Sequence, residues 1–249
     1  MQHEVFPKEK IFKFITLFLL LFTFFSCKKE DIQLPKSSKT ILSDIQDHSP
    51  VYMFFRVKDK DTAVEVNRQN TISTTNWVYN IDKRLPLKFA IPEVMKLQEK
   101  KKNSSHTKEG AVDVYSYADS IGKNLAFLPF TSVTYKYDKE FSKFYIIDNS
   151  KVYLSFQNFS VNFNKENKIT VDGNDVDRIE FVEFIKDYVP FVSQGKTELL
   201  HLNFEVHLTY DQYIQNKIML NELETNSIKF SPIEFIYDTK KLPECGCKL

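Results

Sequence analysis

Glycine, cysteine and tryptophan are scarce in this sequence, and its charge is almost balanced. The 249 residues include only 5 Gly, 3 Cys and 1 Trp. Because 34 basic residues face 33 acidic ones, the formal net charge is +1, and nothing in the composition points to a nucleic-acid-binding protein. The few glycines accompany 23 Phe and 12 Tyr, a balance that favours packed strands and helices over glycine-rich loops.

The sequence also lacks the patterns that mark common catalytic sites. It contains no G-x-S-x-G, no H-E-x-x-H, no phosphate-binding glycine loop and no EF-hand spacing. On one strand, His201 and His207 would lie about 20 Å apart, too far to share a metal ion. We therefore expect no catalytic residues, no metal and no cofactor. Asp and Glu are plentiful, so a carboxylate-based, glycan-active enzyme stays as a distant alternative.

The N-terminus has the layout of a secretory signal. Three basic residues precede a long apolar run: Lys8, Lys10 and Lys13. From Ile11 to Phe25 this run is shorter than the roughly 20 residues that a membrane-spanning helix needs. We therefore predict a cleaved signal peptide over residues 1–26.

Residues 24–27 resemble the lipobox of bacterial lipoproteins, in which a Cys after a small residue is acylated and becomes the new N-terminus. Ser26 precedes Cys27 here, and Phe24 stands where the lipobox usually has Leu. The resemblance implies a lipid-bilayer anchor through two or three acyl chains on Cys27. Several chains hold a protein stably, whereas one chain binds only marginally.

A charged triplet follows the Cys: Lys29, Glu30 and Asp31. It resembles the surface-export signal of certain Gram-negative lipoproteins, a Lys followed by two acidic residues. The resemblance implies an outer-membrane lipoprotein exposed on the cell surface. The alternative is an ordinary charged linker on a protein that faces the periplasm.

A change in composition near residue 50 marks the start of the predicted fold. Residues 27–49 are polar and poor in aromatics, so we expect a lipidated N-terminus and a flexible tether. About 22 flexible residues reach roughly 26 Å.

Residues 241–249 are expected as a tail that carries Cys245 and Cys247. This pair is either reactive or a strained disulfide; the alternatives are an inert tail and a soft-metal contact.

Ordered similarities between the two halves predict an internal repeat. Val51–Phe55 resembles Val152–Phe156, and Ser116–Asp119 resembles Thr209–Gln212. Matches in the same order at similar offsets indicate two copies of one unit. Ser116 and Thr209 would then begin equivalent helices.

Each copy is expected to be an α+β unit of the order β-β-α-β-α-β, with helices on one face of a mixed sheet, over residues 50–140 and 150–240. In the second copy, periodicity predicts strands at 152–163, 168–171, 200–208 and 228–237 and helices at 176–190 and 209–223. Thr209 and Gln212 form a capping box. Pro232 places the last strand at an edge or at a bulge.

Residues 200–208 alternate between apolar and polar side chains. Such a strand should have one face buried in the core and the other exposed to solvent. The residues expected in the core are Leu202, Phe204 and Val206. The residues expected in solvent are His201, Glu205 and His207.

Residues 152–238, and most specifically Ile169–Val176, resemble the periplasmic domain of the ExbD/TolR family. The resemblance implies an envelope or transport-accessory module that dimerises. That family has an N-terminal transmembrane helix with a proton-carrying Asp, whereas the apolar run before Cys27 contains no acid. Proton coupling is therefore not implied, and fold similarity alone does not give function.

Three further features bear on binding or modification. The basic stretch Lys96–Lys108 has two interpretations. It either ends a helix, where the helix dipole stabilises positive charges, or contacts an anionic glycan. Four aromatic residues either pack in the core or form a sugar-stacking platform: Trp77, Tyr79, Tyr115 and Tyr117.

Thr62 and Ser120 each follow an Asp, as in the Asp-(Ser/Thr)-apolar sequon of bacterial O-glycosylation. We favour Thr62, in a charged turn, over Ser120, in a predicted helix.

These features favour a membrane-anchored, extracytoplasmic binding or envelope-assembly module without enzymatic activity. Its expected partners are the bilayer, through Cys27, and a protein or glycan of the envelope. Nucleic acid is not expected.

Replacing the acylated residue tests the anchor. The mature wild-type chain should begin at Cys27 and carry acyl mass, whereas Cys27→Ser should remain unlipidated and leave the detergent phase. Intact mass and detergent partitioning measure both properties. A mature wild-type chain that begins before Cys27, or that lacks acyl mass, would contradict the prediction.

Overall fold

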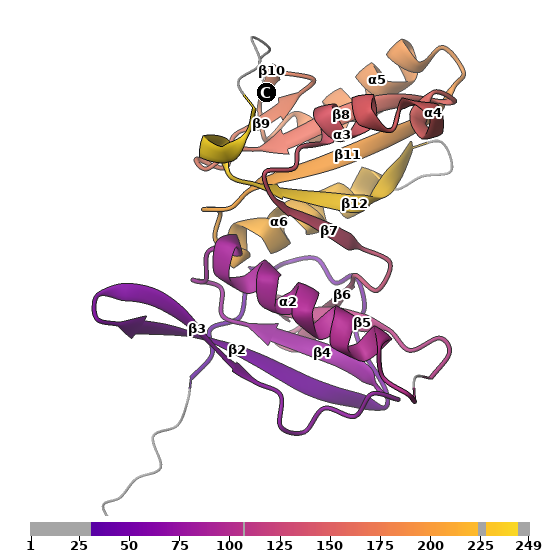
Figure 1. The fold of residues 1–249 in the computed structure, drawn as a ribbon. Coiled ribbons are helices and arrows are strands. Elements are labelled where there is room, and N and C mark those ends of the chain that lie inside the picture. The colour runs from indigo at the N-terminus through magenta and orange to yellow at the C-terminus, as the bar shows by residue number, and fades with distance from the viewer. Residues whose placement is uncertain (1–30, 107, 224–227, 244–249) are drawn as a thin grey trace, which may run out of the picture. The chain divides into compact units, whose positions relative to one another are not determined.

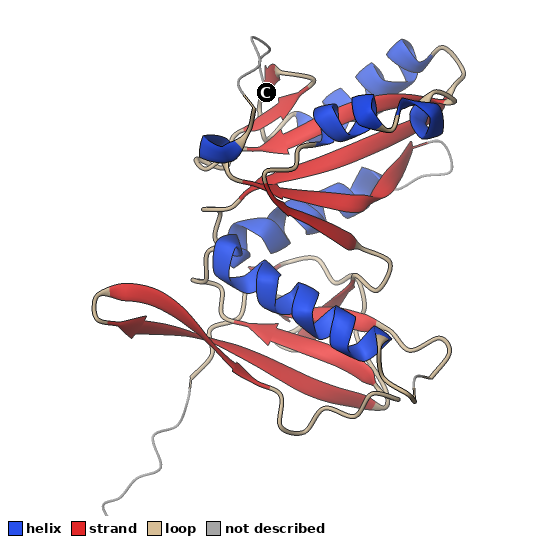
Figure 2. Cartoon of the chain, viewed as in Figure 1, coloured by secondary structure: helices blue, strands red, loops and turns tan. Residues whose placement is uncertain are grey.

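Two six-stranded sheets follow one another along the chain, with helices packed against them (Figure 1, Figure 2). This computed structural model describes residues 31–106, 108–223 and 228–243. The chain divides into Met1–Asp31 and Ile32–Leu249, and the description below concerns the second unit. Its mixed sheets and helices confirm the predicted α+β class.

The first sheet has the strand order β1-β5-β4-β2-β3, and β6 also pairs with β5. β1, β2, β4 and β5 run parallel to their neighbours in this group, whereas β3 and β6 are antiparallel to theirs. Its elements are β1 (Lys36–Ser37), β2 (His48–Lys58), β3 (Asp61–Asn67), β4 (Asn76–Ile81), α2 (Leu87–Lys102), β5 (Asp113–Asp119) and β6 (Leu125–Pro129).

The second sheet has the order β10-β9-β8-β11-β12-β7, in which β8, β11, β12 and β7 run parallel. α5 and α6 pack on one face of this sheet, and α3 and α4 pack on the other. Its elements are β7 (Thr134–Asp138), α3 (Ser142–Asp148), α4 (Ser150–Tyr153), β8 (Phe156–Phe163), β9 (Ile169–Val171), β10 (Asn174–Val176), α5 (Phe181–Ser193), β11 (Thr197–Glu205), α6 (Tyr210–Leu220), η1 (Asn221–Leu223), β12 (Ile228–Tyr237) and η2 (Thr239–Lys241).

Both sheets contain the same run of elements. β2, β3, β4, α2 and β5 correspond to β8, β9, β11, α6 and β12: an antiparallel hairpin, a parallel strand, a helix and a second parallel strand. The predicted equivalence of Ser116 and Thr209 is wrong, because Ser116 lies inside β5 and Thr209 precedes α6. The counterpart of Thr209 is Pro86, before α2. β7, placed in the first repeat from sequence, pairs with β12 in the second sheet.

The two halves meet where α2 and α6 begin. The first N–H groups of a helix have no acceptor inside the helix. Here each half supplies carbonyl acceptors to the helix of the other half. Four reciprocal backbone hydrogen bonds result: Leu87 N to Leu208 O (2.9 Å), Tyr210 N to Leu85 O (2.7 Å), Lys88 N to Val206 O (2.9 Å) and Asp211 N to Lys83 O (3.1 Å).

The turns before these helices are also built alike. Asp82 accepts hydrogen bonds from the backbone N–H and the guanidinium of Arg84, at 3.0 and 2.8 Å. Glu205 accepts one from the backbone N–H of His207 at 2.6 Å and lies 2.9 Å from its Nδ1. Burial would raise the pKa of Asp82, but the hydrogen bonds from Arg84 hold this pKa below its usual value. Each acid therefore fixes the turn that leads into a helix.

β11 departs from the prediction of one wet face. Leu202 and Phe204 are buried as expected, and so is Val206, although the strand ends at Glu205 rather than at the predicted residue 208. His201 and Glu205 are buried as well, so their predicted exposure is wrong, and only His207 is exposed. The reason is that β11 lies between two parallel neighbours and has helices on both faces. The buried imidazole has a polar partner, since His201 Nε2 lies 2.9 Å from Asn158 Oδ1.

The tether predicted to residue 49 is too long. β1 pairs with the end of β5, and Leu42 exchanges backbone hydrogen bonds with Phe127 at 3.1 and 2.9 Å. Gln33 accepts a hydrogen bond from Lys83 N at 2.7 Å. Residues 32–49 therefore belong to the folded unit, because their backbone groups pair along the first sheet despite their polar composition.

The strand predicted at 152–163 begins only at Phe156, because Ser150–Tyr153 form α4, whereas other elements of the second half follow the sequence closely. The capping box at Thr209 is present, and the last strand spans Ile228–Tyr237 as predicted. Pro232 lies at a bulge, where the pairing of β12 with β11 shifts between Leu200 and Leu202. The helix predicted from residue 176 begins later, at α5, because Val176 pairs in β10.

Removing the cap of α6 tests the junction. Thr209→Ala deletes the oxygen that accepts from Gln212 N at 3.2 Å, so the free energy of unfolding should fall by about 1 kcal/mol. Thr209→Ser keeps a hydroxyl and should stay near wild type. Urea denaturation measures both variants, and equal losses would show that the hydroxyl does not cap the helix.

Candidate functional site

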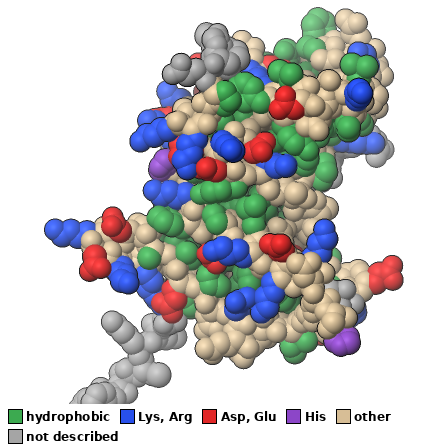
Figure 3. All heavy atoms as spheres, in the orientation of Figure 1, with side chains coloured by type: hydrophobic (Ala, Val, Ile, Leu, Met, Phe, Trp, Pro, Cys, Tyr) green, Lys and Arg blue, Asp and Glu red, His purple; other side chains and the backbone are tan. Residues whose placement is uncertain are grey.

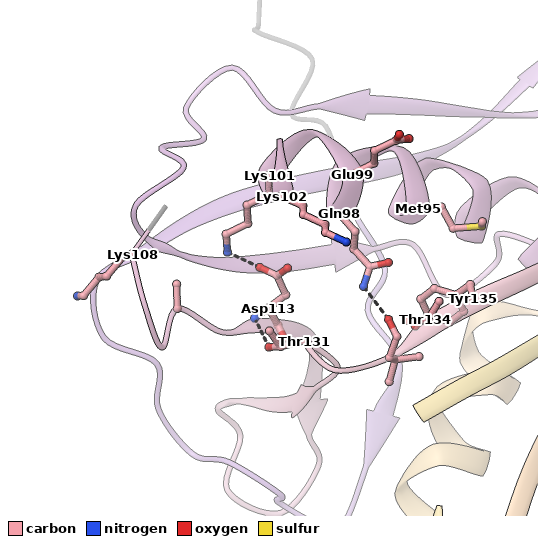
Figure 4. Close-up of a pocket in the computed structure, with 12 residues that line it drawn as sticks. Met95, Gln98, Glu99, Lys101, Lys102, Lys108, Asp113, Thr131, Thr134 and Tyr135 are labelled. Atoms are coloured by element: carbon pink, nitrogen blue, oxygen red, sulfur yellow. Dashed lines mark hydrogen bonds and ion pairs between the residues drawn. The ribbon is translucent and has the colours of Figure 1, made fainter. Parts of the chain in front are cut away.

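A cleft of about 620 Å³ opens beside the second half of α2 (Figure 4). Its other walls come from the start of β5 and from the segment that joins β6 to β7. Both polar and apolar side chains line it. Its polar lining residues include Gln98, Glu99, Lys102, Lys108, Thr131, Thr134 and Tyr135, together with the pair Lys101 and Asp113.

α2 forms one wall because it is apolar on only one side. Its core-facing residues are Leu87, Ala90, Ile91, Val94 and Leu97. Gln98 and Lys102 flank this side and face the cleft. Gln98 Nε2 donates to the carbonyl of Val133 at 3.1 Å, which ties the helix to the opposite wall. The helix ends at Lys102 with lysines in its last turn, as the sequence predicts. The helix dipole stabilises positive charges at this end.

A buried ion pair lies at the inner end of the cleft. Lys101 Nζ is 2.5 Å from a carboxylate oxygen of Asp113, and both side chains are almost completely buried. The Lys101 ammonium also lies 5.1 Å from the ring centre of Trp77, a cation–π contact. Burial raises the pKa of Asp113 above its usual value, although the hydrogen bond and charge of Lys101 oppose this shift.

A chain of buried hydroxyl groups runs inward from Tyr135. The Tyr135 hydroxyl lies 2.6 Å from that of Tyr115 and 3.1 Å from that of Tyr213. Tyr213 donates to Glu234 at 2.7 Å, and Glu234 pairs with Lys217. Burial raises the pKa of all three tyrosines well above its usual value, so they stay neutral. The chain connects the cleft to a smaller one of about 200 Å³ lined by Lys217 and Glu234.

The rim of the cleft carries exposed charge. Lys102 and Glu99 belong to α2 and Lys108 to the segment before β5, and all three are exposed residues that line the cleft. Lys108 pairs with Asp47 at 3.1 Å, but both side chains are more than half exposed. Such surface pairs contribute little free energy, so an anionic ligand can compete for this lysine.

Several residues singled out from sequence lie outside the described residues: Cys27, Lys29, Glu30, Cys245 and Cys247. Asp31 is described and exposed. Thr62 is half-buried in β3, and Ser120 lies in an exposed turn rather than in the predicted helix. The structure therefore makes Ser120 the more accessible of the two hydroxyls.

The other candidates have structural roles. The proposed sugar-stacking aromatics are buried, so the core-packing alternative is confirmed: Trp77, Tyr79, Tyr115 and Tyr117. His201 is buried and His207 exposed, and they do not form one site. Among the described residues, no group of three or more His, Cys, Asp or Glu is placed to hold a metal ion.

Comparisons do not assign a family. The chain matches no family model, no curated protein and no solved structure. In the described ranges, no helix is long and apolar enough to cross a membrane.

Sequence reasoning found the basic end of α2 but missed the ion pair and the tyrosine chain. Lys101 is the middle one of three consecutive lysines, and only the helical position separates it from its neighbours. Asp113 opens a strand whose next four residues are buried, which was the available signal that its carboxylate needs a partner.

The buried imidazole predicts acid sensitivity. Burial lowers the pKa of His201 to about 4, against about 6.5 in an unfolded chain. The unfolded state then binds more protons between these values, so stability is complete above pH 6.5 and falls as the pH drops toward 4. From pH 7.5 to pH 5 the loss should be about 2 kcal/mol. His201→Gln should remove this part of the pH dependence in urea denaturation. The exposed control His106→Gln should retain it, and equal slopes in all three proteins would overturn the prediction.

Proposed function

We propose that this chain is a non-enzymatic binding module, anchored to the outer membrane through a lipid on Cys27, whose cleft beside α2 binds an anionic glycan of the envelope. One observation carries the proposal: a cleft of about 620 Å³ with lysines at its rim and hydroxyl and amide groups on its walls. Its size falls in the range of small-molecule sites.

The charges at the cleft favour a ligand with a carboxylate or similar group. Lys102 and Lys108 stand at the rim, whereas the charge of Lys101 is already balanced by Asp113. Glu99 lies beside Lys102 and disfavours a densely charged polyanion. A ligand with isolated negative charges suits this arrangement best.

The walls favour a polyhydroxylated ligand. Thr131, Thr134 and Gln98 offer hydroxyl and amide groups, which both donate and accept as sugar hydroxyls do. Met95 and Val133 add apolar surface on which the carbon face of a sugar ring can pack. An acidic sugar meets both demands.

The proposed location rests on the sequence. The Ser26-Cys27 junction supports lipidation, and the triplet Lys29, Glu30 and Asp31 supports export to the cell surface. A module held there would meet acidic glycans of the cell's own envelope or of its surroundings.

Charge reversal at the rim tests the binding site. Lys102→Glu with Lys108→Glu should weaken binding of uronic- or sialic-acid oligosaccharides by roughly tenfold to a hundredfold, since a hydrogen bond to a charged group contributes about 1.5–3 kcal/mol. Titration calorimetry measures the affinities, and neutral oligosaccharides of the same length serve as the ligand control.

Lys96→Glu is the matched protein control, because Lys96 lies on the same helix, is exposed and does not line the cleft. It should bind like wild type. Equal binding of acidic and neutral sugars, or no binding of either, would refute the glycan proposal. Shortening of the oligosaccharide during titration would instead support the carboxylate-based enzyme.

A further inference from the structure

The correspondence between the two halves shows where a helix is missing. In the second sheet, α5 lies between β10 and β11 in the chain and packs over β8 and β11. Its inward face consists of Phe181, Ile185 and Val189, all fully buried. Phe181 contacts Phe163 of β8 with ring centres 6.3 Å apart. This helix completes the core on that side of the hairpin.

The first sheet has no counterpart of α5. The connection from β3 to β4, residues 68–75, contains turns and no helix. On the face that α2 covers, Phe55, Val64 and Val66 stay half-buried beside the core, and Val57 toward the hairpin tip is 66% exposed. Arg84 packs over the Phe55 ring at 4.8 Å and closes one end of this surface.

A hollow of about 430 Å³ continues the surface between β3 and α2. Val66, Arg68 and Lys100 border it, with Glu65, Asn67 and Gln69. Figure 3 shows hydrophobic side chains between the projecting β2–β3 hairpin and α2, with charged side chains around them. We call this surface, made by Val64, Val66, Arg68 and Lys100, the hairpin groove.

A partly exposed face of α5 has the complementary chemistry. Phe184, Tyr188 and Phe191 follow one another at helical spacing along it, and we call them the α5 stripe. Phe184 and Tyr188 stack at 4.9 Å and are half-buried against the core, whereas Phe191 is 83% exposed. A shallow hollow of about 420 Å³ lies among these residues and Asp187.

The charges beside the two surfaces are opposite. Glu183 and Asp187 are exposed beside the α5 stripe, although Lys186 pairs with Glu183 at 3.0 Å. Arg68 and Lys100 are exposed beside the hairpin groove, with Glu65 as the single acid that lines the hollow. Apolar surface and charge therefore match between two separate patches of the same chain.

We propose that the α5 stripe of one copy docks in the hairpin groove of a second copy. The groove lacks the helix that its counterpart in the second sheet has, and the stripe combines the exposed Phe191 with two half-buried aromatic side chains. Because the two patches differ, each contact leaves one free groove and one free stripe. Such head-to-tail contacts build chains or rings rather than a closed symmetric dimer.

Two variants break one patch each and keep the fold. Phe191→Asp changes an exposed side chain of the stripe, and Arg68→Glu with Lys100→Glu reverses the exposed charge of the groove. Matched controls sit elsewhere on the described surface: Ile121→Asp, 74% exposed, and Lys123→Glu with Lys240→Glu.

Sedimentation of the purified full chain, kept in one mild detergent, separates the outcomes. The average mass of wild type and of both controls should rise beyond that of a dimer with concentration, whereas each patch variant alone should stay monomeric. An equal mixture of the two patch variants should form dimers that grow no further, since it retains one intact groove and one intact stripe. A monomeric wild type at its highest soluble concentration would overturn the proposal. So would a mixture that stays monomeric, or a patch variant that assembles as wild type does and points to another surface or partner.

Discussion

A helix that starts inside a protein needs acceptors for its first N–H groups, and α2 and α6 obtain them from each other's leading turns. Four backbone hydrogen bonds between residues 83–88 and 206–211 meet this need. An unpaired buried N–H group costs free energy comparable to a lost hydrogen bond. The crossing of the two turns therefore fixes the starts of both helices, and with them the sheets on which the helices pack.

The candidate site depends on this arrangement. Asp113 and Lys101 belong to the first sheet and its helix, whereas Tyr135 belongs to β7 of the second sheet. The hydroxyl chain from Tyr115 through Tyr135 to Tyr213 crosses from one half to the other. A ligand in the cleft would thus contact segments of both halves, and the position of each depends on the shared junction.

The sequence was most informative where local chemistry decides the structure. The capping box at Thr209 and the strand at Ile228–Tyr237 follow from short patterns and were predicted correctly. His201 and Glu205 were predicted to be exposed because alternation alone does not tell a one-sided strand from a central strand whose polar groups are paired. The predicted repeat was aligned on Ser116, whereas the structure matches the ends of β4 and β11, where the chain reads Asn80-Ile81-Asp82 and Asn203-Phe204-Glu205. The Lys101–Asp113 pair was not predicted, because only its position on the helix distinguishes Lys101 from the lysine on either side of it.

The reciprocal turns also set an order of completion during synthesis. Residues 83–88 leave the ribosome well before residues 206–211, since the chain emerges from its N-terminal end. Until the second turn arrives, the start of α2 has only water to accept its first hydrogen bonds. The start of α2 therefore gains its acceptors from Val206 and Leu208 only after more than a hundred further residues have emerged.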